Sequence, residues 1–579
     1  PGQESVSPRC RFLTVFNVTS TRLLPEDAMI EKYLPRTVFS SYEDFKQHYT
    51  VNIPEHFNFA HDVVDEWAAL DPGKKALVWI NDRLERRDFT FSDLSLASNR
   101  AANWFKELGV RKGDSVLLIL KQRPEVWVCL LALHKIGAVA IPATFQLTEK
   151  DIIYRCEAAK VRMIVIADDP EIIRHVGLAR KELSGVEHFV LVSDEPAEGF
   201  EDFRAEVPAR SPVFERDGSI RTSDTMLIYF SSGTTGMPKM VRHDFSYPLG
   251  HIVTAKYWQQ VEDGGLHLTV SDSGWAKFGW GKIYGQWLCG AVVAAHDTEK
   301  FVPETLLKVM ETLKLTTFCA PPTMYRMLIK EDLSRYDLSS IKHCAIAGEP
   351  LNPEVFYRFR EATGLEVREG FGQSETSVLI ANFPWFPVKP GSTGKPSPLY
   401  DLDIVDENGQ SCEDGIVGTI VVRGTDRYSP CGLFKGYRDA PELNAKAFAN
   451  NMYSTGDTAW RDSDGYYWFV GRNDDVIKCS GYRIGPFEVE SALLTHPSVL
   501  ECAITAAPDP VRGQVVKATV VLARGFEPSE ALKKELQNHV KKVTAPYKYP
   551  RILEFVDELP KTVSGKIRRV EIRSRDEEK

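Results

Sequence analysis

Apolar residues in the first part of the chain fall into short runs that alternate with longer helical patterns. The runs with the length and composition of buried strands lie at residues 75–80, 116–120, 138–142, 163–167 and 189–192. Helical spacing marks Phe59 to Leu70, the segment after Thr90 with Ser92 as its expected N-cap, and Glu125 to Ile136, which Gly137 ends. Strands that alternate with helices predict layers of mostly parallel α/β structure.

The same pattern continues beyond a Glu-, Pro- and Arg-rich segment at residues 196–222, which we expect to be a linker. Further buried-strand runs lie at residues 226–230, 267–270, 317–320, 343–347 and 366–368. From Leu402 the strands become short and are separated by Gly and Asp turns, which predicts an antiparallel β unit at about residues 400–473. The segment from Asp474 onward contains two helical and two strand patterns, enough for a small α+β domain.

The predicted fold class is therefore α/β, with three parts along the chain. Residues 1–56 are a leader and extension, residues 57–473 are a large domain of layered, mostly parallel sheets that ends in the antiparallel unit, and residues 474–579 are a small C-terminal domain. A length of 579 residues agrees with several units, because ordinary domains contain roughly 100–200 residues.

Composition narrows the class of protein and its compartment. A hydrophobic content of 43% and a net charge of −9 are typical of a globular protein that is not a general nucleic-acid binder. No apolar run approaches the roughly 18 residues of a membrane span. The ten cysteines include no C-x-x-C pair, which favours a reducing compartment. We expect a cytoplasmic protein, with the mitochondrial matrix as the alternative.

The N-terminal segment leaves two interpretations open. Between Ser5 and Pro25 there is no acidic residue, while Arg9, Arg11 and Arg22 lie among Ser, Thr and apolar residues. This composition is typical of the remnant of an organellar transit sequence. An expression-vector or disordered leader explains it equally well.

Residues 225–239 combine a buried strand with a loop of hydroxyl residues, glycines and one lysine. Met226 to Phe230 is the apolar strand, and the loop after it ends in Pro238 and Lys239. Small residues let backbone N–H groups and hydroxyls approach phosphate oxygens, and the lysine adds a mobile positive charge. Pro238 opposes a helical conformation before the lysine, so this is not the GxxxxGK[ST] loop. The alternative is a Ser/Gly-rich surface turn, but the order of the features favours a polyphosphate site.

The stretch from Tyr229 to Lys239 resembles the phosphate loop of the adenylate-forming superfamily, which includes acyl-CoA synthetases, luciferases and the adenylation domains of peptide synthetases. Matching motifs follow in the expected order from Phe57 to Ile567, nearly the whole chain. The resemblance implies ATP contacts from the loop residues Ser231, Ser232, Gly233, Thr234, Thr235, Gly236 and Lys239.

Two glycine-containing turns, Gly348 to Pro350 and Gly370 to Thr376, follow predicted strands. Ligands of open α/β sheets bind beyond the carboxyl ends of strands, so both turns can face one crevice. Glu375 can hold Mg²⁺ beside a triphosphate, because Mg²⁺ completes its coordination with phosphate and water. Alone, such turns are more often only turns; the resemblance implies a metal role for Glu375 and ligand contacts from its neighbours. Those contacts are Gly348, Glu349, Pro350, Glu369, Gly370, Phe371, Gly372, Gln373 and Ser374.

Three later motifs match the superfamily at residues 453–457, 471–485 and 559–568. An Asp in a Gly turn usually forms the turn itself, and a loop lysine is usually a solvated charge. The resemblance instead implies that Asp457 binds the ribose hydroxyls, Arg472 contacts the nucleotide and Asp474 is the hinge of a mobile C-terminal domain. It also implies that Gly481 lies where the pantetheine arm passes and that Lys566 approaches the substrate carboxylate and the α-phosphate. A cation there would offset the repulsion between two anions as they react.

Segments 507–513 and 545–551 resemble the medium-chain acyl-CoA synthetases and their acetyl-CoA relatives in particular. By this similarity the CoA contacts are Ser480, Gly481, Tyr482, Arg483, Arg512, Lys541, Tyr549 and Arg551. Acetyl-CoA synthetases carry a tryptophan where this chain has Gly372, so glycine implies a deeper acyl channel. The aromatic segment from Trp275 to Trp287 is either the wall of that channel or ordinary core. The expected acyl-pocket residues are Trp275, Phe278, Trp280, Gly372 and Gln373.

The implied function is an acid–thiol ligase that uses Mg²⁺, ATP and CoA. A carboxylic acid longer than acetate, medium-chain or branched, attacks ATP to give an acyl-adenylate and pyrophosphate, and CoA then displaces AMP. No general base is needed, because the acid is already ionised near neutral pH. The expected catalytic residues are Lys566, Glu375 and Lys239. The other interpretations are an adenylation enzyme that serves a carrier protein, a luciferase-type oxygenase and a non-catalytic adenylate sensor. The oligomeric state is open, a homodimer included.

Overall fold

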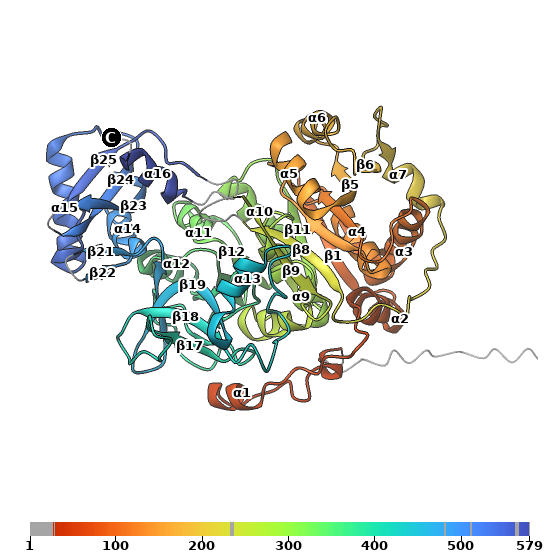
Figure 1. Cartoon of the computed structure of the whole chain (residues 1–579), viewed down its shortest axis with the longest axis horizontal. Coiled ribbons are helices and arrows are strands. Elements are labelled where there is room, and N and C mark those ends of the chain that lie inside the picture. Colours follow the sequence, from red (N-terminus) through yellow and green to blue (C-terminus); the bar gives the residue numbers. More distant parts are fainter. Residues whose placement is uncertain are drawn as a thin grey trace, which may run out of the picture.

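The computed structural model describes residue 27 and residues 29–231, 237–479, 482–509, 512–561 and 567–577. Two large, mostly parallel sheets form the body of the molecule, and helices cover them (Figure 1). The first sheet has seven strands, in the order β7 (Glu201–Asp202), β6 (His188–Val192), β5 (Val161–Ala167), β3 (Ser115–Ile119), β4 (Val139–Pro142), β8 (Thr225–Ser231) and β9 (Lys239–Asp244). Only β9 runs antiparallel to its neighbour, because it returns directly from the loop after β8.

The second sheet has nine strands and lies beside the first. Its order is β16 (Lys395–Pro396), β15 (Ile380–Ala381), β14 (Val367–Phe371), β13 (His343–Ile346), β12 (Thr317–Ala320), β10 (Leu266–Thr269), β11 (Val292–Asp297), β1 (Lys75–Asn81) and β2 (Arg86–Thr90). The strands from β14 to β1 are parallel, so their carboxyl ends share one edge.

Helices connect and cover the strands of both sheets. Those of the large sheets and the N-terminal extension are α1 (Tyr42–His48), α2 (Glu66–Leu70), α3 (Phe91–Glu107), α4 (Glu125–Ile136), α5 (Glu149–Ala159), α6 (Pro170–Ala179), α7 (Phe203–Glu206), α8 (Ala276–Gly281), α9 (Tyr284–Leu288), α10 (Pro303–Leu313), α11 (Pro322–Leu328) and α12 (Pro353–Thr363). The linker expected at residues 196–222 therefore contains the short helix α7.

The antiparallel unit follows as a four-stranded sheet, β17 (Leu402–Val405), β18 (Gly418–Arg423), β19 (Met452–Arg461) and β20 (Tyr467–Arg472), with α13 (Pro441–Ala447) in one connection. The C-terminal part is a five-stranded sheet with three helices, shown in blue in Figure 1. Its elements are β21 (Ile477–Cys479), β22 (Tyr482–Ile484), α14 (Pro486–Leu494), β23 (Val499–Asp509), β24 (Gly513–Leu522), α15 (Glu530–Val543), β25 (Ile552–Phe555) and α16 (Arg569–Glu577). The predicted fold class is confirmed: a large α/β part with an antiparallel β unit precedes a smaller α+β part.

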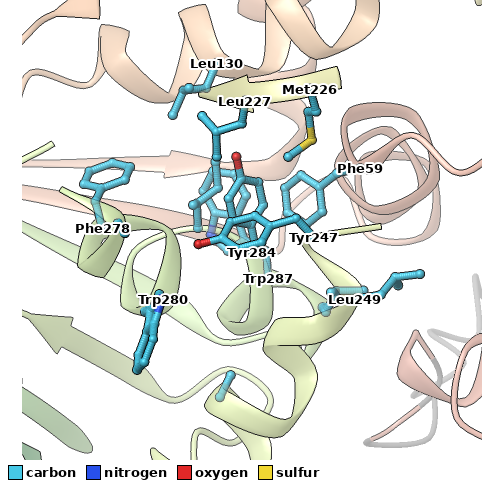
Figure 2. Close-up of a cluster of buried hydrophobic side chains, with 14 of the residues drawn as sticks. Phe59, Leu130, Met226, Leu227, Tyr247, Leu249, Phe278, Trp280, Tyr284 and Trp287 are labelled. Atoms are coloured by element: carbon cyan, nitrogen blue, oxygen red, sulfur yellow. The ribbon is translucent and has the colours of Figure 1, made fainter. Parts of the chain in front are cut away.

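The core between the two large sheets is built from aromatic side chains. Phe59 and Trp287 stack with ring centroids 6.3 Å apart, and Tyr284 packs edge-on against Phe59 at 5.0 Å (Figure 2). The indole N–H of Trp287 donates to the backbone carbonyl of Ala76 on β1. These buried rings join α9 to the first strand.

Two local predictions need correction. Thr90, not Ser92, caps α3, because the Thr90 hydroxyl accepts the Asp93 N–H while the Asp93 carboxylate accepts the Thr90 N–H. The helix expected over Phe59 to Leu70 begins as a π-helical turn, Ala60–Asp65, before it continues as α2.

Candidate functional site

A cavity of about 1970 Å³ opens where the parallel strands end. The last residues of β8 and the turns after β10, β13 and β14 line it on one side, and residues of α14, β23 and α16 line it on the other. It is therefore placed at the carboxyl ends of the strands, between the large and the small part of the chain, as expected for a ligand site of an open α/β sheet.

Lys239, Tyr437 and Glu375 meet at this cavity. The Tyr437 hydroxyl donates to Glu375 Oε1 at 2.9 Å, and the Lys239 Nζ lies 5.2 Å from the centroid of the Tyr437 ring. Burial raises the pKa of Glu375, while the Tyr437 hydroxyl, Lys239 and Arg472 lower it in part. One carboxylate and one ammonium group thus face the same space, held by a tyrosine that joins them.

Gln373 ties the turn after β14 to the antiparallel unit. Its amide nitrogen donates to Asp457 Oδ2 and, at 2.8 Å, to the carbonyl of Thr455, while its amide oxygen accepts the Tyr453 hydroxyl at 2.7 Å. Asp457 on β19 is opposite Arg472 on β20 in the strand register. Burial opposes the charge of Arg472, but Asp457 and Asp474 raise the pKa of its guanidinium above the usual value. The motifs at residues 370–376 and 453–457, which are distant in sequence, therefore lie side by side in the lining of the cavity.

Glu369 is buried deeper, at 5% exposure, on β14. Burial raises the pKa of its carboxyl to about 8, and the N–H of Leu351 donates to its Oε2 at 3.1 Å. A carboxyl in this environment holds a proton at neutral pH. It links β14 to the loop that contains Gly348, Glu349 and Pro350, all three of which line the cavity.

Two tryptophans fill the space beside the glycines of β14 and its turn. A Cβ on Gly370 would overlap the indole of Trp258, and a Cβ on Gly372 would overlap the indole of Trp280. Trp258 and Trp280 are perpendicular, with centroids 6.1 Å apart. The Trp280 ring therefore occupies the space that a side chain at residue 372 would fill.

Of the aromatic segment, Trp275 and Trp280 line the cavity, together with Lys277. Phe278 does not belong with them: it is buried and packs against Trp127 of α4, with centroids 5.1 Å apart (Figure 2 shows its position on α8). Phe278 is therefore a core residue. Neighbouring residues of a helix point in different directions, so Phe278 faces the core while Lys277 and Trp280 line the cavity.

Polar residues Gln122, Asp272 and Lys282 also line the cavity. Lys282 is 2% exposed, and its Nζ donates to the side-chain oxygen of Gln122. Burial lowers the pKa of Lys282 to about 7 and raises the pKa of Asp272 to about 6. Neither group was signalled by a sequence motif.

Several predicted residues lie outside the described part of the chain, namely Ser232, Gly233, Thr234, Thr235, Gly236, Ser480, Gly481 and Lys566. Their described neighbours reach the site. Ser231 and Lys239 pair across the β8–β9 hairpin, and Lys561 forms a bridge with Ile567, both of which line the cavity. Phe371, Ser374 and Asp474 also line it.

Three of the expected CoA residues form one cluster on the C-terminal part. The Lys541 Nζ lies 4.1 Å and the Arg551 guanidinium carbon 4.8 Å from the centroid of the Tyr549 ring. The Arg551 guanidinium also donates to the Tyr549 hydroxyl at 2.6 Å. Two cations around one aromatic ring suit a phosphorylated nucleotide. Tyr482 and Arg483 belong to β22, and the Arg512 N–H donates to Asp509 at the start of the β23–β24 connection.

The described residues contain no group of three or more His, Cys, Asp and Glu side chains that could hold a metal by themselves. Glu375 is a single carboxylate beside a lysine. Such a donor fits Mg²⁺ that is bound mainly by phosphate oxygens and water, which is the usual manner for this ion.

Comparison with known protein families settles the family. Residues 64–438 match the AMP-binding enzyme family, and residues 488–566 match the AMP-binding enzyme C-terminal domain. The chain belongs to the AMP-binding enzyme family.

Relatives and solved structures in this family are similar over nearly the whole chain. The mouse protein named acyl-coenzyme A synthetase ACSM3, mitochondrial, is 42% identical over 93% of this chain and 94% of its own length. The anthranilate CoA ligase AuaEII, solved with anthranoyl-AMP, is 30% identical with a TM-score of 0.83 and coverage of 91% of this chain and 98% of that one. The acyl-CoA synthetase of Brucella canis is 30% identical with a TM-score of 0.71, covering 93% and 99%.

In this AMP-binding enzyme, sequence reasoning missed residues that carry no motif. Tyr437 lies in a connection of the antiparallel unit and Lys277 lies among aromatic residues, so neither has a recognisable spacing to Glu375. Tyr453 stands at the start of a matched motif, on the same face of β19 as Asp457, and this alternation was the available signal. Among the described residues no helix is long and apolar enough to cross a membrane.

Proposed function

We propose that this chain is an AMP-forming acyl-CoA synthetase that activates medium-chain or branched carboxylic acids. The observation that carries the proposal is the single cavity at which Lys239, Glu375 and the Gln373–Asp457 pair converge. The similarity to ACSM3 over 93% of the chain supports the acid–thiol ligase activity. ATP and CoA are its cosubstrates.

In the first half-reaction, the carboxylate oxygen of the acid attacks the α-phosphorus of ATP and pyrophosphate leaves. Lys239, which follows the β8–β9 hairpin loop, would neutralise phosphate charge, and Asp457, opposite Arg472, would accept hydrogen bonds from the ribose hydroxyls. Mg²⁺ would supply charge neutralisation on the phosphates, and Glu375 is the carboxylate that would hold it. Lys566 is the proposed cation at the reacting carboxylate.

In the second half-reaction, the CoA sulfur attacks the acyl carbon and AMP leaves with the bonding electrons. The cluster of Lys541, Tyr549 and Arg551 is the proposed site of the CoA nucleotide, with Ser480 to Arg483 and Arg512 as further contacts. Rotation of residues 474–579 about Asp474 would exchange Lys566 for Gly481 at the cavity, a hinge-type change.

The wall of Trp275, Trp280 and Gly372 supports a substrate acid longer than acetate. The Trp280 ring would limit how far its acyl chain extends past Gly372. Gly372 removes a side chain from the channel, while the Trp280 ring occupies the space beside it. A branched or medium-length chain can extend along this wall on the cavity side, and Gln373 would lie near its carboxyl end.

The expected cytoplasmic location finds no support among the relatives, because ACSM3 of mouse, rat and human carry the word mitochondrial in their names. We therefore propose the alternative, the mitochondrial matrix. Nine cysteines of the described part are buried and form no disulfide there, which agrees with a reducing environment.

The deciding experiment measures pyrophosphate release with ATP, Mg²⁺ and a panel of acids from acetate to dodecanoate, including branched and aromatic acids, with and without CoA. We expect catalytic release that requires CoA and excludes acetate. Turnover that ignores CoA would favour an adenylation enzyme with another acceptor. A Lys239→Gln variant should lose release on every acid, whereas Lys533→Gln, a control on α15 that does not line the cavity, should retain it.

A further inference from the structure

A second cavity, of about 520 Å³, lies at the opposite end of the first sheet from the catalytic one. Thr225 and Val139, the first residues of β8 and β4, line it, whereas the last residues of β8 line the catalytic cavity. No residue of the adenylation site described above enters this second cavity except Tyr437, within the described chain.

Three cationic side chains line the second cavity, and one of them has no acidic partner. Lys112 pairs with Asp224 at 2.7 Å, and the Arg438 Nε lies 3.7 Å from Asp439. Arg242 forms no ion pair with any described residue, although its Nη2 donates to the carbonyl of Lys435. Its Nε is buried and has no hydrogen-bond partner among the described atoms. Arg242 thus lines the cavity without an acidic partner among the described residues, so its charge is available to an anion there.

Tyr437 connects the second cavity to the catalytic one. Its backbone N–H donates to the Asn444 side chain at 2.6 Å, and the Asn444 amide donates back to the Tyr437 carbonyl at 2.8 Å. Asn444 and Tyr437 both line the second cavity, while the Tyr437 hydroxyl donates to Glu375 and its ring is next to Lys239. A ligand that repositions this backbone would move the hydroxyl that holds Glu375.

We propose that the second cavity binds the phosphate group of a small metabolite through Arg242, Arg438 and Lys112, and that occupancy alters the affinity for ATP through Tyr437. A phosphate offers three acceptor oxygens and a charge of roughly −1.5 to −2, which matches a planar guanidinium fork supported by two further cations. Inorganic phosphate and a phosphomonoester share this chemistry. The binding part of the proposal does not depend on the proposed enzymatic function; the coupling part does.

Binding is tested by equilibrium dialysis of the full chain with labelled inorganic phosphate, while a non-hydrolysable acyl-adenylate analogue fills the catalytic site. We expect one phosphate per chain, with glycerol phosphate competing for it. Arg242→Gln and Arg438→Gln should each weaken binding roughly tenfold or more, since each removes a charge-assisted hydrogen bond. Arg242→Gln loses the hydrogen bond to the Lys435 carbonyl and could disturb the fold. Arg438→Gln keeps that hydrogen bond, so it tests phosphate binding even if Arg242→Gln misfolds. Arg427→Gln changes an arginine whose side chain is 86% exposed and should bind as the original protein does.

Absence of phosphate binding beside the analogue, or binding that survives both variants, would overturn the site. Tighter binding of citrate than of either phosphate would overturn the ligand class. For the coupling, phosphate should change the KM for ATP in the original chain and leave it unchanged in Arg438→Gln. If the KM for ATP still changes with phosphate in Arg438→Gln, phosphate competes at the catalytic cavity, and the coupling is overturned. If the original chain binds phosphate but releases no pyrophosphate with any acid, only the proposed function is contradicted.

Discussion

The indole of Trp280 occupies the space that a side chain on residue 372 would need, and Gly372 is the residue that allows it. A Cβ on Gly372 would overlap the Trp280 ring and would lie 2.6 Å from the carbonyl oxygen of Ser377. The two residues come from α8 and from the turn after β14, far apart in the sequence. The depth of the proposed acyl channel would therefore depend on the pair and not on the glycine alone.

Trp280→Ala should shift acid preference toward longer chains, because removal of the indole extends the channel past Gly372. Gly372→Ala should raise the KM for the preferred acid and lower stability by about 1–3 kcal/mol, the usual cost of overpacking. In the double variant the two changes should compensate in part, which a double-mutant cycle on urea unfolding and on pyrophosphate release measures. Gly177→Ala, where a Cβ meets no atom within 4 Å, is the control. Strict additivity of the two substitutions would contradict the pairing.

The sequence predicted the strands that are continuous apolar runs, because burial on both faces of a parallel sheet leaves no polar alternation. It failed at β19, whose Ser, Thr, Gly and Asp residues give no apolar run although Tyr453 and Asp457 anchor the site. The capping error at Ser92 arose because Thr90 has its own acidic partner three residues later.

Site residues could be predicted from the sequence where they belong to a recognisable motif. They could not be predicted where only the packing of distant segments brings them together. Gln373 and Asp457 each belong to a matched motif, but their hydrogen bond depends on how β14 meets the antiparallel unit. Phe278 and Trp280 are two residues apart in one aromatic run, and only the position of α4 assigns the first to the core and the second to the cavity.

Gln373→Glu should raise the KM for ATP by roughly tenfold. The substitution removes the N–H that Asp457 accepts and places a second negative charge beside it, and bonds to charged groups contribute about 1.5–3 kcal/mol. Steady-state pyrophosphate release at varied ATP is the measurement. Gln410→Glu, on an exposed turn of the antiparallel unit, should leave the KM unchanged; an equal rise in both variants would mean that general charge, not this contact, is responsible.

Glu369→Gln should make stability less dependent on pH. Burial raises the pKa of Glu369 to about 8 from its ordinary value of 4.5, so between these values the folded chain keeps a proton that the unfolded chain releases. Stability from this group is full below the lower value and falls as pH rises, by up to about 1.4 kcal/mol per pH unit. In urea unfolding from pH 5 to pH 8, the free energy of unfolding of the variant should rise relative to that of the original chain. Parallel curves, or the same gain in the exposed control Glu361→Gln, would contradict the buried proton.

Lys541→Ala and Arg551→Ala should each raise the KM for CoA about tenfold while pyrophosphate release in the absence of CoA stays within about twofold. Both cations flank Tyr549, and neither lines the catalytic cavity among the described residues. A lost charge-assisted contact to a phosphate accounts for a change of this size. Lys533→Ala lies on the same helix, where its partner is Glu530, and serves as the control. Equal damage to both half-reactions would remove this cluster from the CoA site.

Asp474→Pro should slow thioester formation far more than adenylation. Asp474 lies between β20 and β21, where the chain passes from the large to the small part, and its carboxylate accepts the Arg472 Nε–H at 3.3 Å. Proline fixes φ near −65°, so it would restrict the backbone rotation that the second half-reaction is proposed to need. The two steps are measured separately, as single-turnover acyl-adenylate formation without CoA and as acyl-CoA formation from the preformed adenylate. Asp474→Ala removes the Arg472 contact without fixing the backbone, and should affect both steps alike and mildly. Equal losses in both steps for Asp474→Pro would show that residue 474 supports the nucleotide site instead of serving as the hinge.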